Sequence, residues 1–453
     1  MSIIEKPPDL KNLVEGLHLP SLLTKASQPL FQEVIRKAND NYHHWDKFKH
    51  YSLPSGLSHT ELWTYIKFSR STNKRGAPIY DKEGNQFFYW IPDSLLKALN
   101  EIDRWSGGNI TLDHPDGLAP KEKYIVSSLM EEAIASSQLE GAATTRQVAK
   151  EMLRSGRKPR NVSEQMILNN WETMQYVRNN RKSPLSPESL FAIHKLVTQA
   201  TLKEPDEAGR LRTTDDIVVE YNGEVVHVPP KADTLPERID ALCKFFNENG
   251  DNNWIHPVIK GAMVHFWLAY DHPFTDGNGR TARALMYWYL LSRDYLLFEY
   301  LAFSRYIVRA PGRYVRAYLY TETDDNDMTY FFAYQLRAIQ RAFYELREYL
   351  KRKQEEIVSA STLLKNYRGL NLRQKSLVYN AIRHPERQYT IQEHKNIQGI
   401  VYETARNDLI DLASKGFLKK VMQGREFVFL PSGRIVEKLR LNEAQKNSSN
   451  AAS

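Results

Sequence analysis

The stretch DHPFTDGNGRTARALMYWYL, residues 271–290, brings acid–base, metal-binding and anion-binding side chains together. His272 can accept a proton at neutral pH. Asp276 is a carboxylate of the kind that binds Mg²⁺ beside a phosphate. Arg280 and Arg283 are three positions apart, so they project from one side of a helical turn. Two guanidinium groups carry more positive charge than one carboxylate ligand needs, and a polyphosphate matches them better.

Two glycines in the same stretch favour close approach of a ligand. Gly277 and Gly279 free the backbone, and the apolar run that follows them predicts a buried helix. A glycine-rich turn at a helix N-terminus presents unpaired N–H groups to an anion. The Walker pattern is absent, so a standard P-loop is excluded.

Each of these residues also has an ordinary explanation. Asp276 alone could be a helix N-cap, the two arginines could form surface ion pairs, and His272 could be a structural loop histidine. Their coincidence around one glycine turn favours a catalytic phosphate-binding loop.

The elements that must position this loop are mainly helical. Ser186 is a plausible N-cap and Pro187 suits the first position of the helix that follows. Helical periodicity is clearest over residues 124–140, 162–178, 187–199 and 235–247. One island, residues 209–230, breaks the pattern, since DIVVEY and EVVHV flank the turn signal NG and predict a hairpin that is a candidate flap.

The chain divides into several regions by pattern. Residues 1–112 read as a mixed α/β region with a hairpin at PIYDKEGNQFFYWIP, residues 113–350 as a helical body, residues 365–440 as a small α+β domain, and residues 441–453 as a disordered tail.

Composition limits the class of protein. The 453 residues are 42% hydrophobic and 26% charged, which is typical of a globular protein. No uncharged apolar run reaches the length of a membrane span, and no secretory signal is recognisable. The single cysteine, Cys243, fits a reducing compartment. We therefore expect a soluble, cytoplasmic protein without a membrane partner.

The C-terminal region carries the whole net charge. Residues 361–453 hold 16 Lys and Arg against 8 Asp and Glu, and the rest of the chain is balanced. Helices followed by the hairpin arms FLKKV and EFVFL give the order of a winged helix-turn-helix domain. Val401, Ala405, Leu409 and Leu412 share one helical face, and Gly416 suits its C-cap.

Contact with DNA is one expectation for this basic region. Arg406 and Asn407, off the apolar face, could reach bases or phosphates, and Arg425 would sit at the tip of the wing. Winged helices also serve as protein-docking modules, and that alternative stays open.

A family resemblance enters through the opening stretch. HPFTDGNGRTAR matches the Fic signature H-x-F-x-[D/E]-G-N-G-R-x-x-R at every specified position. The HVPP hairpin resembles the docking flap of that family for target proteins, and PESLFAIHKLV and PGRYVRAYLY resemble the helices before and after. The resemblance covers roughly residues 120–345. It implies a Fic-fold helical bundle with a β-hairpin flap.

The resemblance also implies an activity, the transfer of AMP from ATP to a Ser, Thr or Tyr hydroxyl of a target protein or of the chain itself. His272 would be the base, and Asp276 would hold Mg²⁺. Asn278, with the Gly277 and Gly279 amides, would stabilise charge on the phosphoryl oxygens.

Further contacts with the nucleotide are implied in the same way. Arg280 would contact the β-phosphate, Arg283 the γ-phosphate, and Tyr314 could line the adenosine pocket. Phe274 would anchor the loop in the core.

A second stretch, SSQLEGAATT, resembles the inhibitory motif [S/T]-x-x-x-E-[G/N] of the same family. It matches through Ser136, Glu140 and Gly141, at the end of an expected inhibitory helix over about 122–141. Ser136 and Glu140 are four apart and face the same way on a helix, and Gly141 suits its end. A carboxylate there could pair with Arg283 in place of the γ-phosphate.

The sequence and the resemblance together predict a self-inhibited protein adenylyltransferase; removal of AMP is an alternative activity. The alternatives are another Fic-type transfer, of UMP, phosphocholine or phosphate, and a DNA-binding regulator that only senses a nucleotide. A homodimer is one assembly to test.

Overall fold

The computed structural model describes residues 4–9, 19–107, 121–248, 254–367, 369–423 and 426–441. In this part of the chain the fold is mainly helical, as the sequence predicts, with three two-stranded antiparallel hairpins. The chain divides into two compact units: the first comprises Met1–Ile110 and Glu122–Tyr344, and the second comprises Thr111–Lys121 and Glu345–Ser453. No helix in the described ranges is long and apolar enough to cross a membrane.

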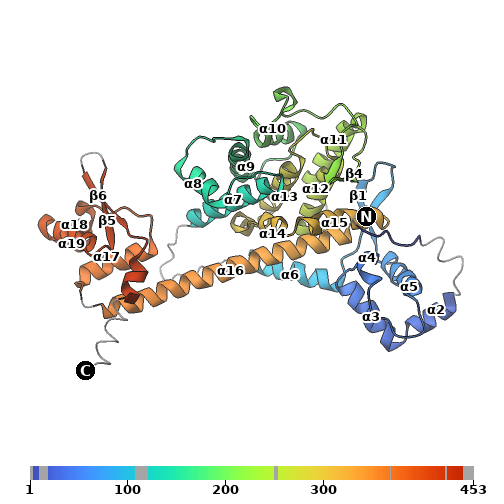
Figure 1. The fold of residues 1–453 in the computed structure, drawn as a ribbon, viewed down its shortest axis with the longest axis horizontal. Coiled ribbons are helices and arrows are strands. Elements are labelled where there is room, and N and C mark those ends of the chain that lie inside the picture. The colour runs from blue at the N-terminus through green and yellow to red at the C-terminus, as the bar shows by residue number, and fades with distance from the viewer. Residues whose placement is uncertain are drawn as a thin grey trace. The chain divides into compact units, whose positions relative to one another are not determined.

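The first unit begins with short helices and a hairpin (Figure 1). Its elements up to the first gap are α2 (Leu19–Ala26), α3 (Pro29–Asp40), α4 (Trp45–Phe48), α5 (His59–Ser71), β1 (Arg75–Tyr80), β2 (Gln86–Tyr89) and α6 (Asp93–Gly107). The predicted hairpin at PIYDKEGNQFFYWIP is confirmed as β1 and β2.

The rest of the first unit is helical except for the flap. The elements before the catalytic loop are α7 (Lys121–Leu139), α8 (Arg146–Ser155), α9 (Val162–Asn179), α10 (Pro187–Thr198), η1 (Pro205–Glu207), β3 (Val219–Tyr221), β4 (Glu224–His227), η2 (Ala232–Thr234), α11 (Leu235–Asn247) and α12 (Pro257–Asp271). Those after the loop are α13 (Asn278–Ser292), η4 (Leu296–Tyr300), α14 (Ser304–Arg309), α15 (Pro311–Thr323) and α16 (Thr329–Asn366).

Local sequence explains several of these boundaries. The Ser186 side chain caps α10 in a reciprocal capping box with Ser189, and Pro187 is its first residue, as predicted. Asn222 and Gly223 both take positive φ at the turn of β3 and β4, which a two-residue hairpin turn requires. The flap, defined here as residues 219–227, is therefore present where the sequence predicts it.

Helices α12 and α13 form the centre of the first unit. Nearly every side chain of both helices is buried, in agreement with the apolar character of their sequences. Helices α9, α10 and α11 pack around this pair. The loop between α12 and α13 is consequently fixed at both ends by buried helices.

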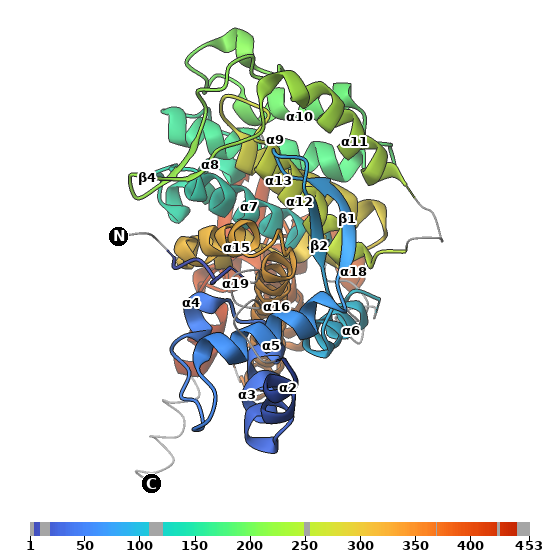
Figure 2. The same cartoon turned by 90° about the vertical axis from the view of Figure 1, so that its right-hand side faces the viewer.

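The N-terminal elements pack on the same core, and do not stand apart from it. Figure 2 shows the hairpin of β1 and β2 beside α12. Phe87 of β2 packs against Phe266 and Tyr270 of α12, with ring centroids 5.2 Å away in each case. The buried Lys67 amine of α5 lies 2.5 Å from Asp324, beyond α15. These contacts place residues 19–107 in the same compact unit as the helical body.

The second unit contains the end of α16 and a small α+β arrangement (Figure 1). Its further elements are α17 (Leu372–Arg383), α18 (Ile391–Gln398), α19 (Tyr402–Ser414), β5 (Leu418–Gln423) and β6 (Glu426–Pro431). Tyr389 pairs with Phe429 of β6 through an isolated antiparallel bridge. The order of three helices and a hairpin agrees with the predicted order of elements.

Helix α16 continues through the charged stretch ELREYLKRKQEEI and ends at Asn366. Val401 is the N-cap of α19 and is 68% exposed, so it does not share the buried face of Ala405, Leu409 and Leu412 as expected. Arg425 and residues 442–453 lie outside the described residues.

Candidate active site

The loop between α12 and α13 spans residues 272–277 and is held by contacts to its own backbone. The Phe274 N–H donates to Asn278 Oδ1 at 3.0 Å, and Asn278 Nδ2 donates to the Phe274 carbonyl at 2.7 Å. Gly277, the residue before α13, takes a φ of 79° that favours glycine. The Asn278 side chain therefore closes the loop; its expected role beside phosphoryl oxygens stays a prediction.

His194 of α10 holds the same loop from behind. Its ring stacks on Phe274 with centroids 3.7 Å apart, and its Nε2 lies 2.9 Å from the Asp276 carbonyl. Its Nδ1 accepts from the Gly209 N–H at 2.9 Å, which fixes the neutral tautomer with the proton on Nε2. Burial lowers the pKa of His194 to about 4, so the ring is neutral at pH 7.

Three carbonyl groups of the loop already have hydrogen-bond donors. The carbonyls of His272, Phe274 and Asp276 accept from Arg212, Asn278 and His194 respectively. The first-turn N–H groups of α13 have no intrahelical acceptor by geometry. These unpaired N–H groups are suited to binding an anion.

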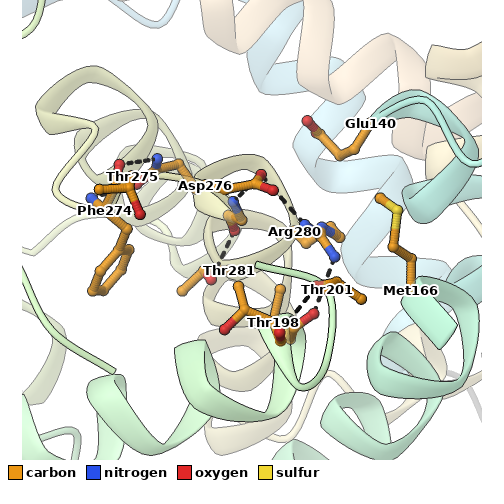
Figure 3. Close-up of polar contacts among 12 residues, drawn as sticks. Glu140, Met166, Thr198, Thr201, Phe274, Thr275, Asp276, Arg280 and Thr281 are labelled. Carbon is orange, nitrogen blue, oxygen red and sulfur yellow. Dashed lines mark hydrogen bonds and ion pairs between the residues drawn. The ribbon is translucent and has the colours of Figure 1, made fainter. Parts of the chain in front are cut away.

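Arg280 and Asp276 lie on one side of this helix end (Figure 3). The Arg280 guanidinium is buried, donates to the Val197 carbonyl at 3.0 Å and lies 3.4 Å from Asp276 Oδ1. The Asp276 side chain is 59% exposed, which leaves its carboxylate open to a cation. Figure 3 also shows Thr198 and Thr201 beside Arg280.

Asp276 is the loop's candidate Mg²⁺ ligand. In the described part of the chain no group of three or more His, Cys, Asp or Glu side chains is arranged to hold a metal ion. Since Mg²⁺ takes one or two carboxylates together with phosphate oxygens and water, one exposed carboxylate beside an anion site fits that ion.

Arg283 has its partners on the helix α7 side of the site. Its Nε donates to Ser136 Oγ at 2.8 Å, and its Nη2 donates to the Ser136 carbonyl and to Glu140 Oε1, both at 2.9 Å. The buried Nη1 atom has no partner among the described residues. The predicted pairing of Glu140 with Arg283 is thus present in the structure.

The geometry of the α7 end differs slightly from the expectation. Helix α7 ends at Leu139, and Glu140 follows in a tighter turn in which its N–H donates to the Ser137 carbonyl at 3.1 Å. Gly141 takes a φ of 93°, as a helix-ending glycine does. This turn puts the Glu140 carboxyl carbon within 2.9 Å of where a methyl group on Gly279 would lie.

The carboxylate of Glu140 therefore covers the N-terminus of α13. Glu140, Gly279 and Arg283 line one pocket together with His272 and Tyr314. An anion that reached the first turn of α13 beside Arg283 would meet this carboxylate.

Tyr314 of α15 forms the wall of this pocket with a buried polar chain behind it. Its hydroxyl lies 2.8 Å from His265 Nε2 and 3.0 Å from the Tyr318 hydroxyl, and Gln335 Nε2 lies 2.9 Å from His265 Nδ1. Burial lowers the pKa of His265 and raises that of Tyr314, so both groups are neutral at pH 7. Tyr314 thus lines the pocket, as predicted.

His272 lies at the mouth of the pocket and has the properties of a base. Its backbone takes a φ of 45°, and Nδ1 lies 3.4 Å from the Ala269 carbonyl. Burial lowers its pKa to about 4, since removal of water disfavours the imidazolium form. At pH 7 the ring is neutral and able to accept a proton.

The flap closes the pocket from the other side, and sequence reasoning missed the residue that holds it. His227 of β4 lies 2.8 Å from Glu322 Oε2 of α15 and 2.7 Å from the Tyr270 carbonyl of α12. HVPP marked the flap, but nothing local identified these two partners.

In the second unit, two of the three predicted DNA contacts, Arg406 and Asn407, are exposed. Arg406 pairs with Glu403 on α19 at 2.9 Å, and Asn407 is exposed beside it. Lys419 and Lys420 are exposed on β5.

The fold is mainly helical, and its catalytic-loop candidate precedes the N-terminus of the buried helix α13. Residues 184–290 match the Fic/DOC family. The chain therefore contains a Fic domain, and the resemblance found in the sequence is confirmed.

Relatives with similar sequences carry a common name. The chain is 28% identical to the protein adenylyltransferase Fic of Nematostella vectensis over 239 residues, which are 46% of this chain and 53% of the relative. It is 30% identical to the protein adenylyltransferase Fic of Culex quinquefasciatus over 282 residues, which are 61% of this chain and 50% of the relative. The chain thus spans about half the length of these relatives.

A solved structure has the same fold. The crystal structure of a Fic family protein from Desulfovibrio desulfuricans matches with a TM-score of 0.53 at 18% identity, over 76% of this chain and 98% of that one. At this identity the match supports the Fic fold.

Proposed function

We propose that this chain is a protein adenylyltransferase that transfers AMP from ATP to a hydroxyl group of a protein and restrains itself through Glu140. The observation that carries the proposal is the pocket at the start of α13. A neutral histidine, His272, and a buried arginine, Arg283, both face it. The curated relatives, named protein adenylyltransferase Fic, support the same activity.

In the proposed reaction the N-terminus of α13 binds the phosphates. The amides of α13 and the Arg280 and Arg283 guanidinium groups bind the phosphoryl oxygens, and Asp276 is the residue that would hold Mg²⁺. Mg²⁺, when bound, supplies neutralisation of negative charge on those oxygens.

The chemical step then needs one base. A hydroxyl oxygen of the target attacks the α-phosphorus of ATP, and its proton passes to His272. The bond from the α-phosphorus to the bridging oxygen breaks, and pyrophosphate leaves.

Glu140 restrains this reaction by occupying the Arg283 side of the site. The ion pair at 2.9 Å takes up the guanidinium that the γ-phosphate would bind. The carboxylate also covers Gly279, where its negative charge would repel phosphate oxygens. ATP that binds beside Glu140 is displaced from the position for in-line attack.

Incubation with α-labelled ATP and Mg²⁺ tests the proposal. We expect Glu140→Gly to raise labelling of the chain itself and of a target, because Arg283 is released. His272→Ala should abolish labelling, and Asp276→Asn should reduce it and raise the Mg²⁺ concentration required. Equal labelling in the three variants and the unchanged chain would contradict the proposal.

The same labelling separates the other transfers. Retention of the α-label indicates AMP transfer, and retention of the γ-label alone indicates phosphate transfer; labelled UTP and CDP-choline test UMP and phosphocholine transfer. Release of AMP from a previously labelled target tests whether the chain also removes AMP. A chain that binds ATP without any transfer would be a nucleotide sensor.

For the second unit we propose contact with nucleic acid. The order of helices and hairpin, with Arg406, Asn407, Lys419 and Lys420 exposed, favours it. Binding to labelled duplex DNA should then weaken steeply as salt rises, because counterions are released on binding. Binding that is absent even at low salt would favour a protein-docking module.

A further inference from the structure

Arg212 binds the catalytic loop and also the chain segments just before and just after the flap. Its side chain is 1% exposed. The Nε atom donates to the His272 carbonyl at 3.0 Å. Its Nη1 donates to the Thr214 carbonyl at 2.7 Å and reaches Asp215 Oδ1 at 3.3 Å, and its Nη2 donates to the Pro230 carbonyl. One guanidinium group thus connects the two segments that flank the flap to the residue expected to act as the base.

The residue that Arg212 holds is in a strained conformation. His272 has φ 45° and ψ 55°, a left-handed backbone that residues other than glycine rarely adopt. The His272 N–H donates to Leu268 at 3.0 Å, and the backbone N–H of Arg212 donates to the Pro273 carbonyl at 2.9 Å. Arg212 therefore holds this strained turn at two successive carbonyls, once through its side chain and once through its main chain.

The rigid planar guanidinium is suited to this role. Its donors are fixed relative to one another, so carbonyls bound at different edges are also fixed relative to one another. A lysine amine is a compact charge on a flexible stem and cannot hold three separate segments in one geometry.

We propose that Arg212 is a positioning residue that couples the position of the flap to the orientation of His272. A protein that docks on the flap then meets a base that is already aligned. Arg212 does not line the pocket that holds Arg283 and Gly279, so in this proposal it acts through His272. The expected effect of Arg212 on the rate of labelling rests on the proposed AMP transfer.

The experiment uses the full chain with Glu140→Gly, which removes the restraint, and compares three further substitutions. Arg212→Lys keeps the positive charge but lacks the planar guanidinium group. Arg212→Met removes the charge. Arg210→Met is the matched control, since Arg210 is exposed two positions earlier. The kcat and KM of self-labelling, the Kd for Mg·ATP and amide hydrogen exchange are measured for each.

We expect kcat to fall roughly 100-fold in Arg212→Lys, because a small misplacement of a reacting group is enough for such a loss. The KM and Kd for ATP should stay within about twofold of the Glu140→Gly parent, because the phosphate site is untouched. Exchange should rise together in peptides covering residues 213–230 and 268–278. Arg210→Met should match the parent in every measurement.

Several outcomes would overturn the inference. One is a kcat within about threefold of the parent, and another is a KM that rises in step with the loss of kcat. Faster exchange in the flap without faster exchange in the loop would show that the two are not coupled. If the Arg212→Met variant fails to fold, the same measurements on the Arg212→Lys variant test the inference. If the Glu140→Gly parent transfers no AMP, the proposed function fails, and hydrogen exchange alone still decides whether Arg212 couples the two segments.

Discussion

At the scale of single residues, His272 must be neutral to accept a proton, and burial lowers its pKa to about 4. The neutral form is lost only as pH falls through that value. We therefore expect the kcat of the Glu140→Gly variant to stay level from about pH 8 down to about 5.5, where a histidine with the usual pKa near 6.5 would already be protonated. A pH profile of self-labelling at saturating Mg·ATP measures this. A rate that halves near the usual histidine pKa would contradict the assignment of His272 as a buried base.

Asn278 supports a second prediction at this scale. Its buried amide binds both the N–H and the carbonyl of Phe274. Asn278→Asp keeps the shape but cannot donate to that carbonyl when ionised, so we expect a loss of stability of about 1–3 kcal/mol and a large fall in labelling. Thermal unfolding and labelling measure the two effects.

Thr281→Val is a matched control for Asn278. The Thr281 hydroxyl donates to the Gly277 carbonyl at 2.9 Å, but that carbonyl also accepts from the Thr281 N–H at 3.0 Å. Its loss should therefore be mild. Equal effects of the two substitutions would mean that the closed loop has no special dependence on Asn278.

The residues of the loop could be predicted because their types and spacing are local. The residues behind the loop could not. His194 and Arg212 lie about 80 and 60 positions from their carbonyl partners, Asp276 and His272. A single sequence does not show which distant carbonyl group a histidine or an arginine will bind. Only the packing of α10 and of the segments that flank the flap brings these side chains to their partners.

At the scale of elements, α7 must be held against α13 for Glu140 to reach Arg283. Glu132 of α7, one helical turn before Ser136, is buried and accepts from the Ser304 N–H at 3.0 Å and from its hydroxyl. Desolvation raises the pKa of Glu132. This contact anchors α7 to the start of α14, and Glu132 itself does not line the pocket.

We therefore expect Glu132→Ala to loosen the restraint from a distance. It removes two hydrogen bonds to a charged or polar group, each worth on the order of 1 kcal/mol, so self-labelling should rise about threefold to tenfold. Glu132→Gln, which keeps an acceptor, should have a smaller effect.

Combination with Glu140→Gly is the control for this interpretation. In the Glu140→Gly background the ion pair with Arg283 is already absent. Loosening α7 by Glu132→Ala should therefore add no further labelling activity. A rise of equal size in both backgrounds would mean that Glu132 acts on catalysis by another route.

At this scale the sequence is informative where a pattern is periodic or capped. The boundaries of α10 and of the flap follow from Ser186, Pro187 and the NG turn. The end of α7 is less predictable, because Glu140 lies in a tighter turn one residue beyond the helix. The consequence for the site is the same, since the turn still directs the carboxylate to Arg283.

At the scale of the whole chain, the uneven distribution of charge identifies the basic C-terminal region. The sequence does not predict that the N-terminal region packs on the helical body. Lys67 pairs with Asp324, 257 positions away, and Tyr42 donates to Asp327, 285 positions away. These buried contacts join residues 19–107 to the helical body. Composition gives no sign of them because each side looks like an ordinary polar surface.

Buried histidines of the first unit predict how its stability depends on pH. The pKa values of His43, His44, His194 and His272 are all lowered to about 4 by burial. In the unfolded chain a histidine titrates near 6.5, so between these values the unfolded state binds more protons, and stability falls as pH decreases. Asp271 opposes this weakly, since burial raises its pKa to about 6.

We therefore expect the thermal midpoint of the first unit to drop by several degrees between about pH 7.5 and pH 5. All eight tryptophans precede residue 345, so tryptophan fluorescence follows this unit alone. His194→Gln cannot titrate, and its midpoint should fall less over the same range, even if it starts lower. A midpoint that is level between the two pH values would mean that these histidines are not held neutral by burial, and the neutral base assigned to His272 would lose its physical support.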